Sequence, residues 1–534
     1  MNRMKKEMGE LMLQNIVKYL FCLSVFFVLI FIGQAQHLQA ESKNDETTLV
    51  NGELWYDSDG NYIQGHGGNI LSYNGRYYWV GEYKQSANFS GIALYSSNDL
   101  MNWKFEHMIL TPETPKGDTT IGFCTIERPK LIYNGSDFIL WAHWENGNDY
   151  TESKLLVAKC DIINGNYEFV KLFNPQTTQK GENGEFLYST NRSLDFTIYN
   201  DAVDNGNGTI KNQAYLISAC GHDMCVYKLT EDCMDVVPKE SYKFWKGAGR
   251  EAPSMVKVND YYVLLTSGQS GWYPNQSMYG YTKDISNPDE WTLANALITI
   301  GNNSTYYSQP TNIAVVEDKT GNKQCIYMGD RWDKENLGES TYVWLPMDIT
   351  IDENSDKKVQ ISMDYLNQWS FQTSTGTFIK PKESLISENK QVTVSIAGTQ
   401  KHPASQAVDG IIDTDTTWGN SNYYELSQAR VPFTIEIDLE EVSPLTRMDL
   451  STRLCNGSET YYQYIVEGSV DGISWSTILD ENANKVVGFR SHKLKGDYRY
   501  VKLTVNAIKN IHNENMAVWA AGIVEWQIYA SKAF

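Results

Sequence analysis

Two glutamates have the same unusual setting: Glu127 in "IERPKLIYNGSDFILW" and Glu251 in "REAPSMVKVNDYYVLL". Each lies beside an arginine and shortly before a proline, and each motif continues as an apolar strand, an N-G or N-D turn and an aromatic strand. Cleavage of a glycosidic bond needs a proton donor for the leaving oxygen and an opposite group that activates water or attacks the anomeric carbon. A glutamate in a cleft lined with carboxylates can have a raised pKa and donate at neutral pH. The two glutamates, with Asp195 as a third carboxylate, therefore indicate carbohydrate chemistry.

The elements that carry these residues recur along the chain. Five stretches open with a polar residue, cross an apolar strand, turn and return on an aromatic strand, at intervals of 56 to 68 residues: they begin at His66, Glu127, Asp195, Glu251 and Gln309. Such a unit fits one four-stranded antiparallel sheet, so the pattern predicts an all-β fold with a five-bladed β-propeller. The innermost strands of a propeller face its axis, so we expect the five polar residues to converge in one axial pocket. The alternative is that each merely begins a strand in solvent.

Other residues fit the same pocket. Arg128 and Arg250 are expected to keep a neighbouring carboxylate charged, and the aromatic rings of Trp272, Trp144 and Tyr150 to stack on the apolar face of a sugar. The alternative interpretation is that these rings belong to the core and that the charges are paired for structural reasons.

The character of the sequence changes towards the C-terminus. Residues 346–390 are charged and poor in aromatic residues, as in a closing strand and a connector. From Gln391 onward, alternating strands with turn residues between them predict an antiparallel β-sandwich. The expected organisation is a signal peptide at 1–35, a linker at 36–50, a propeller at 51–385 and a sandwich at 386–534.

Composition narrows the classes of function. A basic start, an apolar run from Tyr19 to Ile32 and small residues after it predict a cleaved secretory signal, because the run is short for the alternative, a transmembrane anchor. We therefore expect a secreted or periplasmic protein without stable membrane insertion after cleavage. The net charge of −20 argues against nucleic acid as a partner. Cys220 and Cys225 are close enough to form a disulfide, although free thiols are equally compatible with the sequence.

The first domain resembles glycoside hydrolase family 43, and within it the branch of exo-β-1,3-galactanases and related bacterial galactosidases. The motifs that carry the resemblance follow that branch's order over nearly all of residues 51–345: they are "HGGNILSYNGRYYWVGE", "IERPKLIYN", "SLDFTIYND", "REAPSMVK", "SGWYPN", "YYSQPTNI" and "YMGDRW".

The resemblance implies an exo-acting, inverting hydrolase that releases galactose from β-1,3-galactan or arabinogalactan side chains and needs no cofactor for catalysis. It implies that Glu251 is the general acid and that Glu127, together with Asp195 and Tyr150, binds the sugar at the cleavage subsite. The base aspartate of the wider family is absent from "DSDGNYIQGHGG". In the galactanase branch a glutamine is thought to hold the water instead, and this residue corresponds to Gln309.

The sequence departs from that branch at one motif, and this departure bears on which sugar is bound. The branch has Ser-Arg-Asp where this chain has Ser193-Leu194-Asp195. Arabinofuranose or galactofuranose therefore stays open as the terminal sugar. A propeller that binds glycans without turnover is the alternative from another class.

The second domain resembles the discoidin, or factor V/VIII type C, sandwich of family 32 carbohydrate-binding modules. This resemblance implies binding of galactose-type sugars and a structural Ca²⁺. Asp409, Asp415 and Glu525 offer the oxygen ligands that calcium prefers, although they are equally compatible with solvated turns. The aromatic residues Trp418, Tyr423 and Tyr424 are the candidates for stacking on a sugar.

Overall fold

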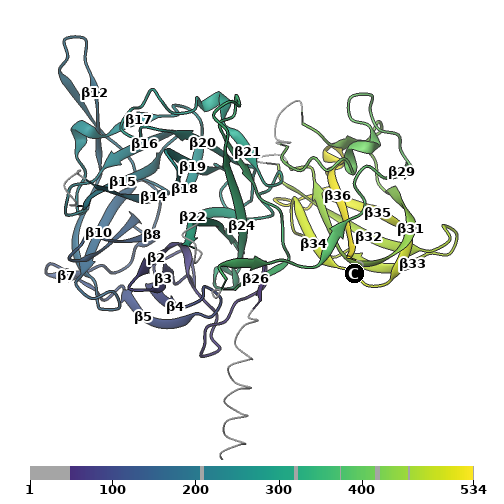
Figure 1. Ribbon diagram of the computed structural model, residues 1–534, viewed down its shortest axis with the longest axis horizontal. Coiled ribbons are helices and arrows are strands. Elements are labelled where there is room, and N and C mark those ends of the chain that lie inside the picture. The colour runs from purple at the N-terminus through teal and green to yellow at the C-terminus, as the bar shows by residue number, and fades with distance from the viewer. Residues whose placement is uncertain are drawn as a thin grey trace, which may run out of the picture. The chain divides into compact units, whose positions relative to one another are not determined.

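The computed structural model describes residues 48–204, 210–317, 323–372, 375–414, 421–454 and 458–532 (Figure 1). The predicted signal segment lies outside these residues. Residues Val50–Phe534 form one compact unit. Within the described part of the chain, no helix is long and apolar enough to cross a membrane.

Five four-stranded antiparallel sheets follow one another along the chain. Their strands, in chain order, are β2 (His66–Tyr73), β3 (Arg76–Glu82), β4 (Ile92–Ser97) and β5 (Lys104–Leu110); β8 (Thr125–Tyr133), β9 (Phe138–Glu145), β10 (Lys154–Cys160) and β11 (Glu168–Phe173); β14 (Phe196–Asp204), β15 (Ile210–Cys220), β16 (Asp223–Lys228) and β17 (Tyr242–Phe244); β18 (Arg250–Val258), β19 (Tyr261–Gly268), β20 (Ser277–Thr282) and β21 (Ile298–Ile300); and β22 (Gln309–Glu317), β23 (Lys323–Arg331), β24 (Thr341–Ile351) and β25 (Val359–Ser362).

The first strands of these sheets form a closed ring. β2 contacts β8, and contacts then run through β14, β18 and β22 back to β2. The prediction of an all-β fold with a propeller is therefore confirmed. The count of five units was incomplete, because β1 (Leu49–Val50), β26 (Gln368–Gln372) and β27 (Thr377–Ile379) form a further, three-stranded sheet.

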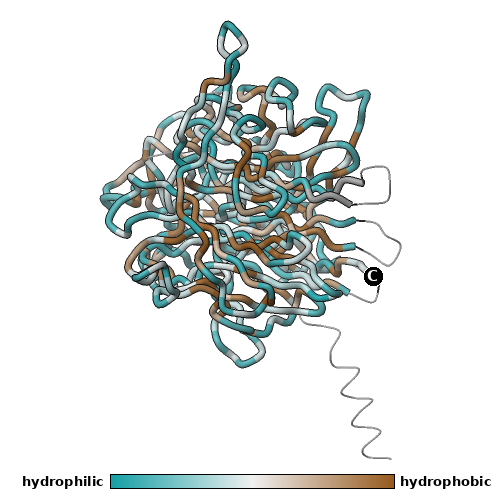
Figure 2. Tube along the Cα trace, turned by 90° about the vertical axis from the view of Figure 1, so that its left-hand side faces the viewer, coloured by the Kyte–Doolittle hydropathy of each residue, from teal (hydrophilic) through white to brown (hydrophobic). Residues whose placement is uncertain are grey.

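Apolar side chains fill the spaces between neighbouring sheets. One cluster joins the first and second sheets, and others join the second to the third, the third to the fourth and the fourth to the fifth. Apolar stretches accordingly run through the interior, whereas many outer loops are polar (Figure 2). The inner strands are mostly buried over their first residues, and a site built on such strands is held more precisely than a site built on loops.

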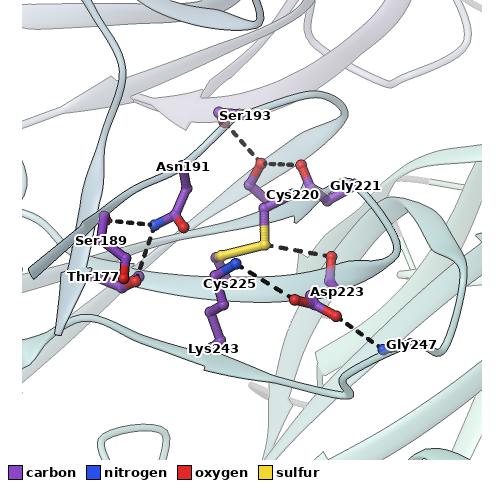
Figure 3. Close-up of a disulfide and its surroundings, with 12 residues drawn as sticks. Thr177, Ser189, Asn191, Ser193, Cys220, Gly221, Asp223, Cys225, Lys243 and Gly247 are labelled. Atoms are coloured by element: carbon purple, nitrogen blue, oxygen red, sulfur yellow. Dashed lines mark hydrogen bonds and ion pairs between the residues drawn. A yellow bond between two sulfur atoms is a disulfide. The ribbon is translucent and has the colours of Figure 1, made fainter. Parts of the chain in front are cut away.

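Smaller elements decorate the propeller. Two short hairpins are formed by β6 (Pro115–Lys116) with β7 (Thr119–Thr120), and by β12 (Gln176–Lys180) with β13 (Phe186–Thr190). Single 3₁₀ turns lie at Pro238–Glu240, Ala294–Ala296 and Leu337–Glu339. A disulfide joins Cys220 to Cys225 near the turn between β15 and β16 (Figure 3), so the pairing that the sequence left open is present.

The C-terminal domain is a nine-stranded antiparallel sheet system around its own apolar core. Its strands are β28 (Glu383–Leu385), β29 (Gln391–Val394), β30 (Tyr424–Glu425), β31 (Phe433–Thr452), β32 (Thr460–Ser469), β33 (Ser476–Glu481), β34 (Phe489–Lys493), β35 (Asp497–Asn510) and β36 (Gly522–Ser531), with 3₁₀ turns at Ala404–Ala407 and Val518–Ala520. The predicted boundary at residue 386 stays a prediction.

Candidate active site

Three inner strands share a backbone irregularity near their first residues. In β2, β8 and β18 the antiparallel register shifts just after His66, Glu127 and Glu251. The residue that follows each of them has a positive φ: 63° at Gly67, 55° at Arg128 and 50° at Ala252. A bulge of this kind turns a side chain away from the regular ladder.

These strand ends surround a cavity of 290 Å³. Six of the predicted site residues line it: Glu127, Tyr150, Asp195, Glu251, Trp272 and Gln309. The expected convergence therefore occurs for residues from four of the five inner strands.

His66 is the exception. Its side chain is fully buried, with Nδ1 3.3 Å from Asp330 Oδ1 and Nε2 3.4 Å from the Tyr342 hydroxyl, and it does not line the cavity. The expectation that His66 converges in the cavity is therefore wrong, and its contact with a substrate stays a prediction. Gly67 follows it, and the Gly67 N–H also donates to Asp330, so His66 belongs to the support behind the cavity.

Cations surround Glu127. Lys84 Nζ lies 3.3 Å from Oε1, His143 Nδ1 lies 3.5 Å from Oε2, and the Tyr150 hydroxyl donates to Oε1 at 2.9 Å. Burial alone would raise the pKa of Glu127, but the charges of Lys84 and His143 hold it well below its usual range. Glu127 is thus ionised at neutral pH.

His143 is the cation that Glu127 shares with a second acid. Its Nε2 lies 3.0 Å from Glu145 Oε1. Burial would lower the pKa of His143, but the two glutamates outweigh it and raise the pKa to about 9. The imidazole therefore carries a proton at neutral pH and adds a positive charge to this side of the cavity.

Glu251 has the opposite surroundings. Burial, followed by the negative charge of Asp195, raises the pKa of Glu251 to about 8, against the opposing charges of Arg128 and Arg250. Arg250 donates to the Thr266 hydroxyl and carbonyl, whereas Arg128 pairs with Asp195 at 3.0 Å. Glu251 thus keeps its proton at neutral pH, as a general acid must.

Gln309 links the two sides. Its Oε1 accepts from Arg128 Nη2 at 2.5 Å and from Trp332 Nε1 at 2.9 Å, and its Nε2 donates to Glu251 Oε1 at 3.0 Å. The expectation that Gln309 shares a cavity with Glu127 and Glu251 is met. Its distance from Glu251 is shorter than the roughly 6.5–9.5 Å between the two groups of an inverting pair, so its role as water holder stays a prediction.

Aromatic rings form one wall. Trp272 and Trp332 meet edge to face with centroids 5.4 Å apart, and Lys84 Nζ lies 5.5 and 5.4 Å from the two ring centroids. Such rings suit the apolar face of a sugar. Trp144 is not among the residues that line the cavity.

Residues 66–353, more than half of the chain, match the sequence model of glycosyl hydrolases family 43. The chain belongs to glycosyl hydrolase family 43. Residues 388–521 match the F5/8 type C domain. No curated protein matches the chain.

Solved structures of this family are similar to the chain. The β-1,3-galactosidase BT3683, solved with galactodeoxynojirimycin, is 27% identical, with a TM-score of 0.51; the match covers 60% of this chain and all of that one. An exo-β-1,3-galactanase from Clostridium thermocellum is 25% identical, with a TM-score of 0.54, covering 86% and 100%. An exo-β-1,3-galactanase from Phanerochaete chrysosporium, at 24% identity and a TM-score of 0.56 over 90% and 100%, shows the shared fold.

The sequence did not indicate four residues that line this family 43 site: Glu82, Lys84, His143 and Trp332. Arg128, which was expected to keep a neighbouring carboxylate charged, lines the cavity and pairs with Asp195. The strand register offered a signal for part of this set. Glu82 is the register partner of His66 and His143 is the register partner of Glu127, so both lie at the same end of their sheets as the predicted residues. Counting back across each predicted hairpin would have found both.

The chain has Leu194 where the galactanase branch has an arginine, but an arginine lies two residues earlier, at Arg192. Arg192 Nη2 donates to the Tyr150 carbonyl at 2.5 Å and its Nε to Ser153 Oγ at 3.0 Å. Arg192 therefore holds the loop that carries Tyr150, while Leu194 places an apolar side chain in the wall.

The predicted metal ligands of the sandwich are only partly described. Asp415 lies outside the described residues. Glu525 is buried, its Oε1 accepts from Gly410 N–H at 3.2 Å, and its Oε2 has no partner among the described residues. Burial and the charge of Asp409 raise the pKa of Glu525 to about 9. No group of three or more His, Cys, Asp or Glu side chains in the described ranges is arranged to hold a metal.

None of the three aromatic residues predicted to stack on a sugar in the sandwich is described as exposed. Trp418 lies outside the described residues, and Tyr423 and Tyr424 are buried. Tyr423 stacks on His402 with centroids 4.4 Å apart, and Arg453 lies 5.1 Å from its ring. Arg453 also donates to the carbonyl of Trp519, whose ring is half exposed. His402 is itself buried, so Arg453 and the half-exposed Trp519 mark a polar and aromatic patch that the sequence did not predict.

Proposed function

We propose that this family 43 protein is an exo-acting glycoside hydrolase that releases galactose from β-1,3-galactan or from arabinogalactan side chains, with inversion. The observation that carries the proposal is one cavity holding a glutamate that keeps its proton, Glu251, and a glutamate that stays charged, Glu127. The similar β-1,3-galactosidase and exo-β-1,3-galactanase support the choice of sugar.

In the proposed reaction, Glu251 gives its proton to the glycosidic oxygen while that oxygen leaves the anomeric carbon. Water adds to the same carbon from the opposite face of the ring and releases a proton to the solvent, from which Glu251 is reprotonated. Glu127 and Asp195 accept hydrogen bonds from sugar hydroxyls, and Trp272 covers the apolar face. The glycosidic oxygen displaces Gln309 Nε2 from Glu251, and the proposal requires the amide of Gln309 to move away from Glu251 so that it orients the water on the opposite face of the ring.

The test is to incubate the protein with β-1,3-galacto-oligosaccharides, an arabinogalactan and an arabinofuranosyl substrate, and to identify the released sugars and their anomeric form. Release of single galactose units in the inverted configuration supports the proposal, whereas release of arabinofuranose alone moves the activity to the alternative sugar. Binding of these glycans without release favours the non-catalytic propeller, a reading motivated by the absent base aspartate.

The water-holding role has its own test. Gln309→Ala should lose most turnover and retain product binding, because Glu127, Asp195 and Tyr150 are unchanged. Full activity of Gln309→Ala would transfer the water-activating role to Glu127.

For the sandwich we propose weak binding of galactose-type sugars at the patch of Arg453 and Trp519. Arg453 contributes cationic donors and Trp519 an exposed ring, the combination that fits a sugar's hydroxyls and its apolar face. Trp519→Ala should abolish retention on galactose-containing glycans without reducing turnover of a short oligosaccharide.

We also propose that Glu525 and Asp409 hold a structural Ca²⁺. The partnerless buried oxygen of Glu525 fits a hard cation, and an ion there would release the proton that the raised pKa otherwise retains. Addition of Ca²⁺ after treatment with a chelator should raise the melting temperature, and Glu525→Gln should remove this response. We further propose export through cleavage of residues 1–35, which N-terminal sequencing of the mature protein tests.

A further inference from the structure

A turn of unusual backbone leads into Gln309. Thr305, Tyr306 and Tyr307 have φ values of 49°, 56° and 57° in succession. Residues with a side chain rarely adopt this left-handed region, and consecutive ones are rarer still. Surrounding contacts must therefore impose the conformation. We call residues 302–308 the left-handed turn.

Part of the support comes from the propeller. Asn302 Oδ1 accepts from the backbone N–H of Tyr306 at 2.6 Å and of Ser304 at 3.2 Å. Arg331 donates through Nη2 to the Tyr306 carbonyl at 2.8 Å and through Nε to the Tyr307 carbonyl at 3.0 Å. These bonds fix both ends of the strained segment.

The rest of the support comes from the sandwich. Asn302 Nδ2 donates to Ser451 Oγ at 2.9 Å, and Asn303 Nδ2 donates to the Thr452 carbonyl at 2.8 Å. All four residues are buried, and Ser451 and Thr452 are the last residues of β31.

Apolar packing closes the same interface. Phe489 of β34 belongs to the cluster of buried residues that joins the fourth and fifth sheets, and its ring meets that of Tyr306 with centroids 5.4 Å apart. The approach is close, since a Cβ built on Gly488 would lie 3.2 Å from Ser304 Cβ. The sandwich thus packs against the left-handed turn in addition to bonding it.

We infer that the sandwich is a positioning element for the catalytic cavity: through Ser451, Thr452 and Phe489 it holds the left-handed turn and so sets the place of Gln309. The side chain of Gln309 contacts Arg128, Trp332 and Glu251 at once, so a shift of its backbone disturbs three contacts of the site. A displacement of about 1 Å can cost about a hundredfold in rate. The effect on turnover rests on the proposed function, whereas the effect on the turn does not.

The test uses the full chain with Ser451→Ala, Asn303→Ala and their combination. Ser451→Thr keeps the hydroxyl as the conservative variant. Asn506→Ala is the matched control, because Asn506 Nδ2 donates to Asn482 Oδ1 at an exposed place in the sandwich. Two properties are measured: amide hydrogen exchange of residues 304–309, and kcat and KM on a β-1,3-galacto-oligosaccharide, with the affinity for galactose alongside.

The inference predicts faster exchange in 304–309 for the alanine variants, restored by Ser451→Thr and absent in Asn506→Ala. It predicts that kcat of the combined variant falls about tenfold or more, while the affinity for galactose stays within about threefold. Unchanged exchange of the turn in the combined variant overturns the inference, as does faster exchange with native kcat. If the unmodified protein cleaves none of the glycans, the proposed function fails, and the exchange result alone decides whether the sandwich holds the turn.

Discussion

Glu127 and Glu251 open equivalent strands, and in both cases a residue with left-handed backbone follows at once. Their surroundings nevertheless differ in charge. Glu127 lies between Lys84 and His143, whereas Glu251 has Asp195 nearby and the neutral amide of Gln309 at 3.0 Å. The pKa of Glu127 is therefore lowered and that of Glu251 raised.

The two cations that lower the pKa of Glu127 lie on, or just after, the second strand of a sheet. His143 is the register partner of Glu127 in β9, whereas the partner of Glu251 in β19 is Ser267, a neutral residue. Lys84 reaches Glu127 from the segment after β3 in the neighbouring sheet. The same strand motif thus occurs in two protonation states. The glutamate whose register partner is a cation is charged, and the glutamate whose register partner is neutral keeps the proton that it can donate.

The largest effect is expected from removing the proton of Glu251. Glu251→Gln should lower kcat/KM on natural oligosaccharides by at least about a hundredfold, the usual contribution of a general acid. The loss should shrink with substrates whose leaving groups need little protonation. Steady-state kinetics on both substrate types tests this, with Glu168→Gln, at an exposed site on β11, as the control. Near-native turnover of natural oligosaccharides would remove Glu251 from the role.

The next largest effect concerns the cation beside Glu127. Lys84 is buried between Glu82, at 2.7 Å, and Glu127, so Lys84→Met removes the cation beside Glu82 and leaves Glu127 with His143 alone. Breaking a buried pair costs about 3–5 kcal/mol, and kcat/KM should fall because Glu127 loses the cation that helps to hold its carboxylate in place. Thermal denaturation and kinetics measure the two effects.

A second variant separates charge from packing at this position. Adding Glu127→Gln to Lys84→Met should recover part of the melting temperature, because a carboxylate that has lost this cation is removed, but none of the activity. A melting temperature of Lys84→Met equal to the native value would show that the ion pair contributes nothing to folding.

The sequence could predict the parts of this site that repeat. The polar residue ahead of each apolar strand was visible at Glu127, Asp195, Glu251 and Gln309, because strand period and turn residues are local signals. The resemblance to family 43 supplied their expected roles.

Other parts depend on contacts that no local pattern carries. His66 begins its unit as Glu127 does, yet Asp330 and Tyr342, more than 250 residues away in the chain, enclose it. The three-stranded sheet likewise joins β1 to β26 from opposite ends of the propeller sequence. The anchoring of the left-handed turn by Ser451 also belongs to this class.

The pH dependence of the reaction tests the protonation state of Glu251. Glu251 must carry its proton to act, so kcat/KM should fall as the pH rises through about 8, the raised pKa of that carboxyl. The negative charge of Asp195 contributes to this raised value. Asp195→Asn should therefore lower the pKa of Glu251, and the alkaline limb of kcat/KM should move to lower pH. A limb that stays in place would assign the raised pKa to burial alone.

The smallest effect is expected on the Glu127 side, at Tyr150. Its hydroxyl donates to Glu127 Oε1 at 2.9 Å, and the side chain is 46% exposed. Tyr150→Phe removes one bond to a charged group but leaves Lys84 and His143 in place, so Glu127 stays ionised. KM should rise by about fivefold, the equivalent of about 1 kcal/mol at an exposed site, with kcat nearly unchanged. The alkaline limb of kcat/KM should not move, because the hydroxyl that is removed donates to Glu127. The surroundings of Glu251 are unchanged in this variant. Steady-state kinetics across pH measures both features. A shift of that limb in Tyr150→Phe would mean that the two glutamates titrate as one coupled pair, and the division between a charged and a protonated glutamate would no longer hold.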